Sequence, residues 1–225
     1  VQTAMPDTFR SARRRSNVRA NIFAFECIVV LATFVWAMHR RLATTAPTRF
    51  VVLASMGIVY FARLNFMSRY LLQRELTVEE LTVVIVVWLP SILCSFVYFS
   101  SMDDDLPISQ IIILSGFYLL GSFLNTYSEY QRKKWKQYPQ SNGRCYTAGL
   151  FSLSRNINYF GDVVLFAAWA GTTGCWINAW APILMALTFW FHHIPDKEMY
   201  LAKRYGRYWS EYLEQTPYAL IPCIC

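Results

Sequence analysis

The chain has 225 residues, of which 55% are hydrophobic, 17% aromatic and only 16% charged. This composition is too apolar for an ordinary water-soluble domain of this length and predicts an integral membrane protein. The formal charge of +7 requires no nucleic-acid partner, because loops on one side of a membrane collect Lys and Arg and face anionic lipids.

The apolar segments predict an all-α, polytopic transmembrane bundle with about six spans. A helix of roughly 20 apolar residues crosses the hydrocarbon, and the sequence lacks the strand-like alternation of a membrane barrel. In chain order, the predicted spans are residues 21–38, 48–62, 81–100, 108–127, 157–171 and 176–193.

A basic segment, residues 1–20, precedes the first span. Its Arg-rich, acid-poor composition suits either a juxtamembrane anchor or a processed organellar N-terminus. The predicted compartment is therefore the endoplasmic reticulum membrane or the mitochondrial inner membrane.

The remaining charges agree with the six-span topology. The N-terminus, the 128–156 segment and the C-terminal tail then share one side, which holds every Lys and Arg except Arg40, Arg41 and Arg49. Such a bias is typical of membrane proteins.

Six cysteines occur without a CxxC pair, so the sequence predicts free thiols and no disulfide framework. His192 and His193 are adjacent but lack further ligands, and no metal site is predicted.

We expect a single membrane domain over residues 1–225, with one long polar interruption at residues 128–156. Two polar stripes flank it, each on one face of a helix. The stripes are Asn125, Glu129 and Arg132, then Arg155, Asn158 and Asp162. They form either a shared polar pocket or an ion-paired helix contact in which Arg155 and Asp162 neutralise each other.

The C-terminal segment interleaves aromatic and basic residues, which is typical of an amphipathic helix at the membrane interface. Its apolar positions are Tyr200, Leu201, Tyr205, Tyr208, Trp209 and Tyr212.

Two blocks of the sequence resemble the steroid 5α-reductase and sterol reductase superfamily, which includes the DUF1295-like membrane reductases. The first block runs from Asn125-Thr-Tyr-Ser-Glu-Tyr-Gln-Arg132 through Gly149-Leu-Phe-Ser-Leu-Ser-Arg-Asn-Ile-Asn-Tyr-Phe-Gly-Asp162. The second block is the tail, with Tyr205-Gly206, Trp209, Tyr212, Pro217-Tyr218, Pro222 and Ile224. The resemblance extends over residues 116–225, about half the chain.

The resemblance implies an NADPH-dependent oxidoreductase that reduces a C=C bond in a steroid-like, sterol-like or other lipid enone. It implies that residues 116–225 bind the cofactor, with the phosphates near Lys203, Arg204 and Tyr205. The other implied cofactor-binding residues are Asn125, Glu129, Arg155, Asn158, Tyr159 and Asp162. The implied partners are membrane lipids and an apolar lipid substrate.

Three positions depart from the family pattern: Glu129 stands where 5α-reductases have Asp, Asn156 where many relatives have His, and Cys225 in place of the terminal aromatic residue. No catalytic residue is assigned. One alternative is therefore a structural subunit of an organellar membrane complex that keeps the fold without activity, with other membrane subunits as partners. A second is an isoprenylcysteine or phospholipid methyltransferase, although Arg155-Asn-Ile-Asn-Tyr-Phe-Gly161 fits the reductase pattern better.

Overall fold

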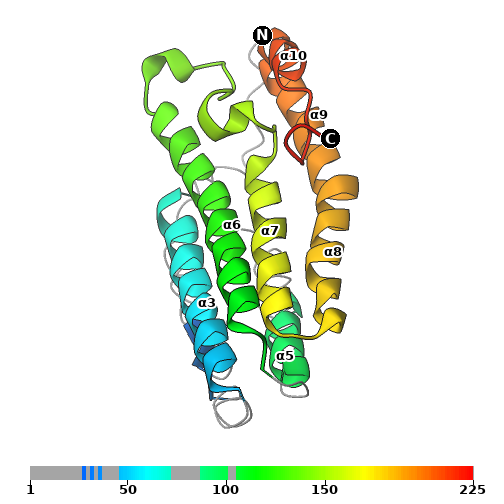
Figure 1. Ribbon diagram of the computed structural model, residues 1–225. Coiled ribbons are helices and arrows are strands. Elements are labelled where there is room, and N and C mark those ends of the chain that lie inside the picture. Colours follow the sequence, from blue (N-terminus) through cyan, green and yellow to red (C-terminus); the bar gives the residue numbers. More distant parts are fainter. Residues whose placement is uncertain are drawn as a thin grey trace. The chain divides into compact units, whose positions relative to one another are not determined.

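The computed structural model describes residues 27–28, 31–32, 35–36, 46–71, 87–100 and 105–224, and its regular elements there are all helical (Figure 1). The chain divides into two compact units, residues 1–101 and 102–225. The basic N-terminal segment and most of the predicted first span lie outside the described residues. The single-domain organisation stays a prediction.

In the first unit, α3 (Pro47–Phe66) continues into a π-helical turn, η2 (Met67–Leu71), and α5 (Leu89–Ser100) follows. Proline suits the first position of α3 because its missing N–H would have no helical partner there. The buried guanidinium of Arg49 donates to the carbonyl oxygen of Ser100 at 3.1 Å. This hydrogen bond joins the beginning of α3 to the end of α5.

The second unit begins with the long helix α6 (Ile108–Trp135), followed by α7 (Ile157–Thr172) (Figure 1). A helical run then comprises η6 (Trp176–Ala179), α8 (Trp180–Thr188), η7 (Phe189–His193) and α9 (Ile194–Tyr205). Gly206, with φ of 51°, separates α9 from α10 (Arg207–Gln215). Glycine suits this position because residues that carry a Cβ are strained in this backbone conformation.

The predicted polar interruption begins later than expected. Helix α6 continues to Trp135, so residues 128–135 are helical, and the connection to α7 contains two short 3₁₀ turns, η4 (Pro139–Ser141) and η5 (Gly149–Ser152). The last turn of α6 carries Arg132, Lys133 and Lys134, whose positive charges favour the negative end of a helix dipole. The polar composition of residues 128–135 therefore indicates a helix that extends beyond the hydrocarbon of the bilayer, and these residues do not form a loop.

Two helical segments in the described part of the chain are long and apolar enough to cross a membrane, Pro47–Leu71 and Ile108–Trp135. On α6, Ile112, Ile113 and Leu119 are 58–64% exposed, which suits contact with lipid better than contact with water. The predicted span at 157–171 is the single 16-residue helix α7, and the predicted span at 176–193 is divided into η6, α8 and η7. The structure thus supports a helical membrane protein without fixing the number of spans at six.

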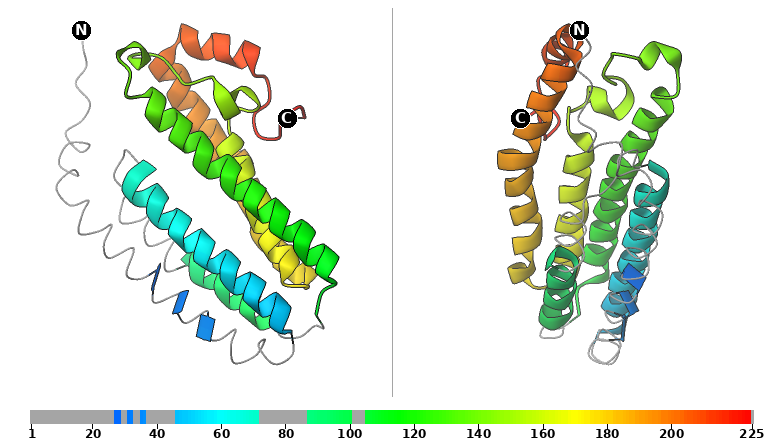
Figure 2. Two further views of the ribbon diagram at one scale, coloured as in Figure 1. Left: turned by 60° about the vertical axis from the view of Figure 1, so that its left-hand side comes forward. Right: turned by 180° about the vertical axis from the view of Figure 1, so that it is seen from behind.

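The α6–α7 connection and the C-terminal helices lie at the same end of the second unit (Figure 2). The guanidinium of Arg144 lies 5.1 Å from the ring centroid of Tyr208, and the Cys145 thiol donates to the Tyr208 carbonyl oxygen at 3.5 Å. Trp209 and Tyr212 of α10 are buried. This arrangement agrees with the prediction that the connection and the tail lie on the same side of the membrane. Part of the aromatic face predicted to contact the membrane interface packs against protein instead.

Candidate functional site

Helices α6 and α7 approach closely where Gly121 faces Gly161. A Cβ added to Gly161 would lie 2.6 Å from the backbone nitrogen of Asn125 and 2.7 Å from the carbonyl oxygen of Gly121. Real Cβ atoms do not tolerate such distances, so only glycine permits this contact. One turn further along, the two predicted polar stripes face each other.

An amide and carboxylate network joins these stripes. Asn125 Nδ2 donates to Asp162 Oδ2 at 2.8 Å and to the Asn158 carbonyl oxygen at 3.0 Å. Asn158 Nδ2 donates to Glu129 Oε1 at 2.9 Å, and Arg132 forms an ion pair with Glu129. The structure therefore brings together four of the predicted site residues, Asn125, Glu129, Asn158 and Asp162.

Two buried acceptors in this network remain unused. Because both asparagine side chains donate to oxygen atoms, their amide nitrogens must face those oxygens and their Oδ1 atoms point elsewhere. Neither Asn125 Oδ1 nor Asn158 Oδ1 accepts a hydrogen bond from a described residue. A buried acceptor without a partner costs free energy, so the site is suited to a ligand that donates hydrogen bonds.

Arg155 does not pair with Asp162. Its Nε donates to Glu198 Oε1 at 2.9 Å, and its Nη1 donates to the carbonyl oxygens of Thr216 and Pro217 at 2.9 and 2.7 Å. The sequence-based alternative in which Arg155 and Asp162 form an ion pair is therefore wrong, because Arg155 pairs with Glu198. Helical spacing placed Arg155 and Asp162 on one face, but Arg155 precedes the first turn of α7 and turns toward the tail.

Residues 154–156 hold the tail through its backbone. Besides the two bonds from Arg155 Nη1, the Arg155 N–H donates to the Tyr218 oxygen at 3.0 Å. Asn156 Nδ2 donates to the Ala219 oxygen at 2.7 Å, and Ser154 Oγ to the Leu220 oxygen at 2.8 Å. Five successive carbonyl groups, residues 216–220, thus accept hydrogen bonds from three successive residues. We call this contact the tail clamp.

The tail clamp brings together the two sequence blocks that carry the family resemblance. The Ser-Arg-Asn triplet of the first block holds the Pro217-Tyr218 segment of the second. Sequence reasoning missed this contact, and it missed the roles of Ser154 and Asn156. The only available signal was the presence of both blocks in one chain.

The side chain of Tyr159, in the first turn of α7, packs against the π-helical turn η7. Its ring stacks on that of Phe189 with centroids 4.4 Å apart and an interplanar angle of 15°, and the His193 ring centroid is 6.5 Å away. The Tyr159 ring also contacts Lys197, whose ammonium lies 4.8 Å from the ring centroid, as in a cation–π interaction. π-Helical turns often occur at functional sites.

Lys197 is a site residue that the sequence did not single out. Its Nζ donates to Asn156 Oδ1 at 2.8 Å. Burial, followed by the positive charge of Arg132, lowers the pKa of Lys197 to about 7, whereas Glu129 and Glu198 oppose the shift. A lysine that is half ionised near neutral pH is uncommon outside functional sites.

The predicted phosphate-binding residues occupy the end of α9. Lys203 and Arg204 are exposed, and Arg204 donates to the Tyr200 hydroxyl and lies 5.6 Å from the Tyr205 ring centroid. The pKa of Lys136 is lowered by burial, then by the positive charge of Arg132 and, to a smaller extent, by that of Arg204. Cations from α6 and α9 therefore gather at one end of the second unit.

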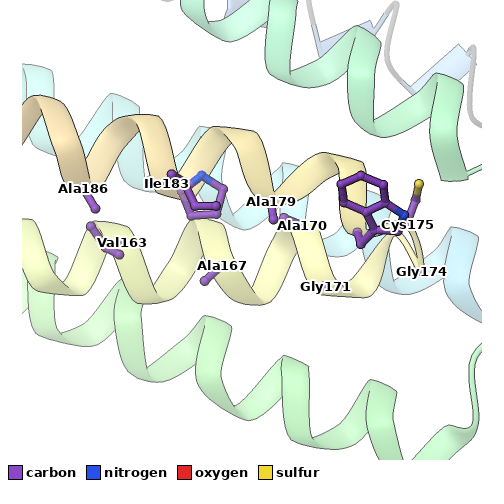
Figure 3. A pocket seen from close by; sticks show the side chains of 11 residues that line it. Val163, Ala167, Ala170, Gly171, Gly174, Cys175, Ala179, Ile183 and Ala186 are labelled. Atoms are coloured by element: carbon purple, nitrogen blue, oxygen red, sulfur yellow. The ribbon is translucent and has the colours of Figure 1, made fainter.

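An apolar groove of about 540 Å³ lies between α7 and α8 (Figure 3). Small side chains from both helices line it, among them Val163, Ala167, Ala170, Ala179 and Ala186. Its volume falls within the range of small-molecule sites. The stacked pair Tyr159 and Phe189 lies about one helical turn beyond Val163 and Ala186, between the groove and Lys197.

The sequence profile of the family described as "Protein of unknown function (DUF1295)" matches residues 24–216. The chain is 27% identical over 154 residues to a Delta(14)-sterol reductase of Mus musculus, and 23% identical over 161 residues to a probable 7-dehydrocholesterol reductase of Acanthamoeba polyphaga mimivirus. It is 24% identical over 155 residues to a Delta(14)-sterol reductase of Methylotuvimicrobium alcaliphilum. Each match covers 61% of this chain and 35–36% of the relative, so the chain spans about a third of the length of these relatives.

Proposed function

Because the chain belongs to the DUF1295 family, and because it is similar to proteins named sterol reductases, we propose that it is a membrane-embedded, NADPH-dependent reductase. The expected reaction is reduction of a C=C bond in a sterol-like or other lipid substrate. Family membership confirms the resemblance to the steroid 5α-reductase and sterol reductase superfamily. The structural-subunit and methyltransferase alternatives are not favoured by these similarities.

The observation that carries the proposal is the pair of unused acceptors, Asn125 Oδ1 and Asn158 Oδ1. A nicotinamide carboxamide and ribose hydroxyl groups are hydrogen-bond donors, which these oxygens need. Asp162 and Glu129 hold the two amide groups in place. We therefore assign Asn125 and Asn158 to the cofactor, and Asp162 and Glu129 to the positioning of these asparagines.

The cofactor's phosphates would meet the cations at the same end of the unit. Arg132, Lys136 and Arg204 supply positive charge there, and Lys203 and Tyr205 lie on the same turn of α9 as Arg204. Arg155 is engaged with Glu198 and the tail, so we assign it to holding the tail clamp. This differs from the direct cofactor contact that the family resemblance implied for Arg155.

The bound nicotinamide would supply the hydride that the reduction of a C=C bond requires. The contribution of this chain is to orient the cofactor and to exclude water from the reacting carbon. The apolar groove between α7 and α8 offers a surface for the rings or chain of a lipid substrate. Tyr159, stacked on Phe189, would separate this apolar region from the charged cofactor site.

The proposal is tested by titrating NADPH into the purified protein in detergent, with Asn158→Leu as the diagnostic variant. Asn158→Leu should weaken NADPH binding by more than tenfold, since it removes the unused acceptor and frees Glu129. The matched control is Asn178→Leu, because Asn178 is also a buried, hydrogen-bonded asparagine but lies in η6, beyond the C-terminal end of α7. Equal NADPH affinity of the wild type and Asn158→Leu, with both proteins folded, would overturn the assignment.

A further inference from the structure

Lys197 is held in one orientation by two neighbours. Asn156 donates through Nδ2 to the Ala219 oxygen of the tail clamp, so Asn156 Oδ1 is fixed as an acceptor and receives the Lys197 ammonium at 2.8 Å. The Tyr159 ring lies against the same ammonium, 4.8 Å from its centroid to Nζ. The position of this positive charge is therefore set by both the tail and α7.

The carboxylates near Lys197 already have partners. Glu129 on α6 pairs with Arg132, and Glu198, its neighbour on α9, pairs with Arg155 at 2.9 Å. Within the described part of the chain, Lys197 makes no ion pair. An ammonium has three N–H donors, and one is used by Asn156.

We propose that Lys197 binds a phosphate group of the dinucleotide and that this contact makes cofactor binding depend on pH. The inference rests on the proposed function and adds to it a residue and a form of regulation. A partly buried ammonium with two unused donors is suited to a phosphate, because charge-assisted hydrogen bonds are among the strongest in proteins. Lys197 lies four residues after His193 on the same helical run.

The sign of the pH effect follows from the charges that face Lys197. Burial and Arg132 lower its pKa to about 7, and Glu129 and Glu198 partly offset them. Below pH 7 the ammonium is present and binds the phosphate, and above pH 7 the free protein loses this proton. Affinity for the dinucleotide should therefore be highest on the acidic side and should fall as pH rises from 7 toward 9.

Three variants and two nucleotides test this inference by direct titration of binding between pH 6 and pH 9. Lys197→Met should weaken NADPH binding at pH 6 by about 10- to 100-fold and should remove the decrease above pH 7. Lys197→Arg should keep strong binding and also remove that decrease, because a guanidinium stays charged. Lys134→Met is the control, since Lys134 also lies over a tyrosine ring, 5.5 Å from the Tyr130 centroid.

The comparison of nucleotides identifies the phosphate. If Lys197 binds the additional phosphate of NADPH, Lys197→Met will leave NADH binding unchanged, and if it binds the shared diphosphate, both affinities will fall. A Lys197→Met protein that binds NADPH with wild-type affinity and wild-type pH dependence overturns the inference while the proposed function stands. Absence of nucleotide binding by the wild type at every pH overturns both.

Discussion

Asn125 and Asp162 join α6 to α7 through a 2.8 Å hydrogen bond from the amide to the carboxylate. The bond forms one turn from the point where Gly121 meets Gly161, so close helix packing and polar contact support each other. Because Asp162 fixes the amide nitrogen of Asn125, it also fixes the direction of the unused Asn125 oxygen. The stability of the helix pair and the recognition of a ligand therefore depend on the same carboxylate.

Replacing Asp162 should affect both properties. Asp162→Ala leaves an N–H of Asn125 without its acceptor and should lower the free energy of unfolding by about 1 to 3 kcal/mol, and NADPH affinity should fall with it. Melting temperature and nucleotide titration measure the two effects. Asp105→Ala, which removes an exposed carboxylate that accepts from the backbone of Leu106, should change neither. Unchanged stability and affinity in Asp162→Ala would contradict the proposed network.

The Gly121–Gly161 contact predicts opposite effects for two alanine substitutions. Gly161→Ala places a methyl group against Asn125 N and should destabilise the protein by about 1 to 3 kcal/mol through overpacking. Gly116→Ala on α6 meets nothing within 4 Å and should stabilise the helix by about 0.5 to 1 kcal/mol. Thermal unfolding in detergent measures both, and an equal effect from the two substitutions would refute the close packing.

Breaking the pair of Arg155 and Glu198 should release the tail. Their side chains are only 9% and 26% exposed, so Glu198→Gln leaves a largely buried cation poorly paired, which costs about 3 kcal/mol. Hydrogen exchange of the Arg155 backbone N–H, which donates to the Tyr218 oxygen of the tail, should accelerate in this variant. Glu211→Gln provides the control, because the ion pair of Glu211 with Arg207 is exposed and contributes little. Wild-type exchange rates in Glu198→Gln would show that the clamp does not depend on this pair.

Filling the groove should affect the lipid substrate and spare the cofactor. Ala167→Trp places an indole in the space between α7 and α8 and should raise KM for a sterol-like substrate while NADPH affinity stays within about twofold of wild type. Ile112→Trp adds the same bulk to the exposed surface of α6 and should leave both values unchanged. A normal KM in Ala167→Trp would place the substrate elsewhere.

Helical periodicity placed Asn125 and Glu129 on one face of α6, and Asn158 and Asp162 on one face of α7. It left open how the two faces would pair. It failed for Arg155, whose partners lie 43 and more residues along the chain. Long-range contacts of this kind are set by the path of the connection and the tail, which local spacing does not encode. The same reason explains why Asn156 and Lys197 were not predicted.

Length and apolarity predicted the helices but not where α6 would end. Residues 128–135 are polar, yet they continue the helix, because a hydrogen-bonded helix extends beyond the bilayer as readily as it crosses it. Hydropathy reports the solvent around a segment, whereas helix boundaries depend on local backbone preferences. A stripe of polar residues at the end of a predicted span is therefore better interpreted first as the continuation of the helix than as the start of a loop.

The most direct test of the central claim is turnover by the purified wild-type protein in lipid nanodiscs, with NADPH and a panel of sterol and fatty enones and dienes. NADPH oxidation is followed by absorbance and the lipid product by mass spectrometry. The proposed function predicts that one substrate class gains two hydrogen atoms in a 1:1 ratio with NADPH oxidised, and that Asn158→Leu, folded and with saturating lipid, is slower by more than tenfold. A folded wild-type protein that neither binds nor oxidises NADPH with any member of the panel would contradict it.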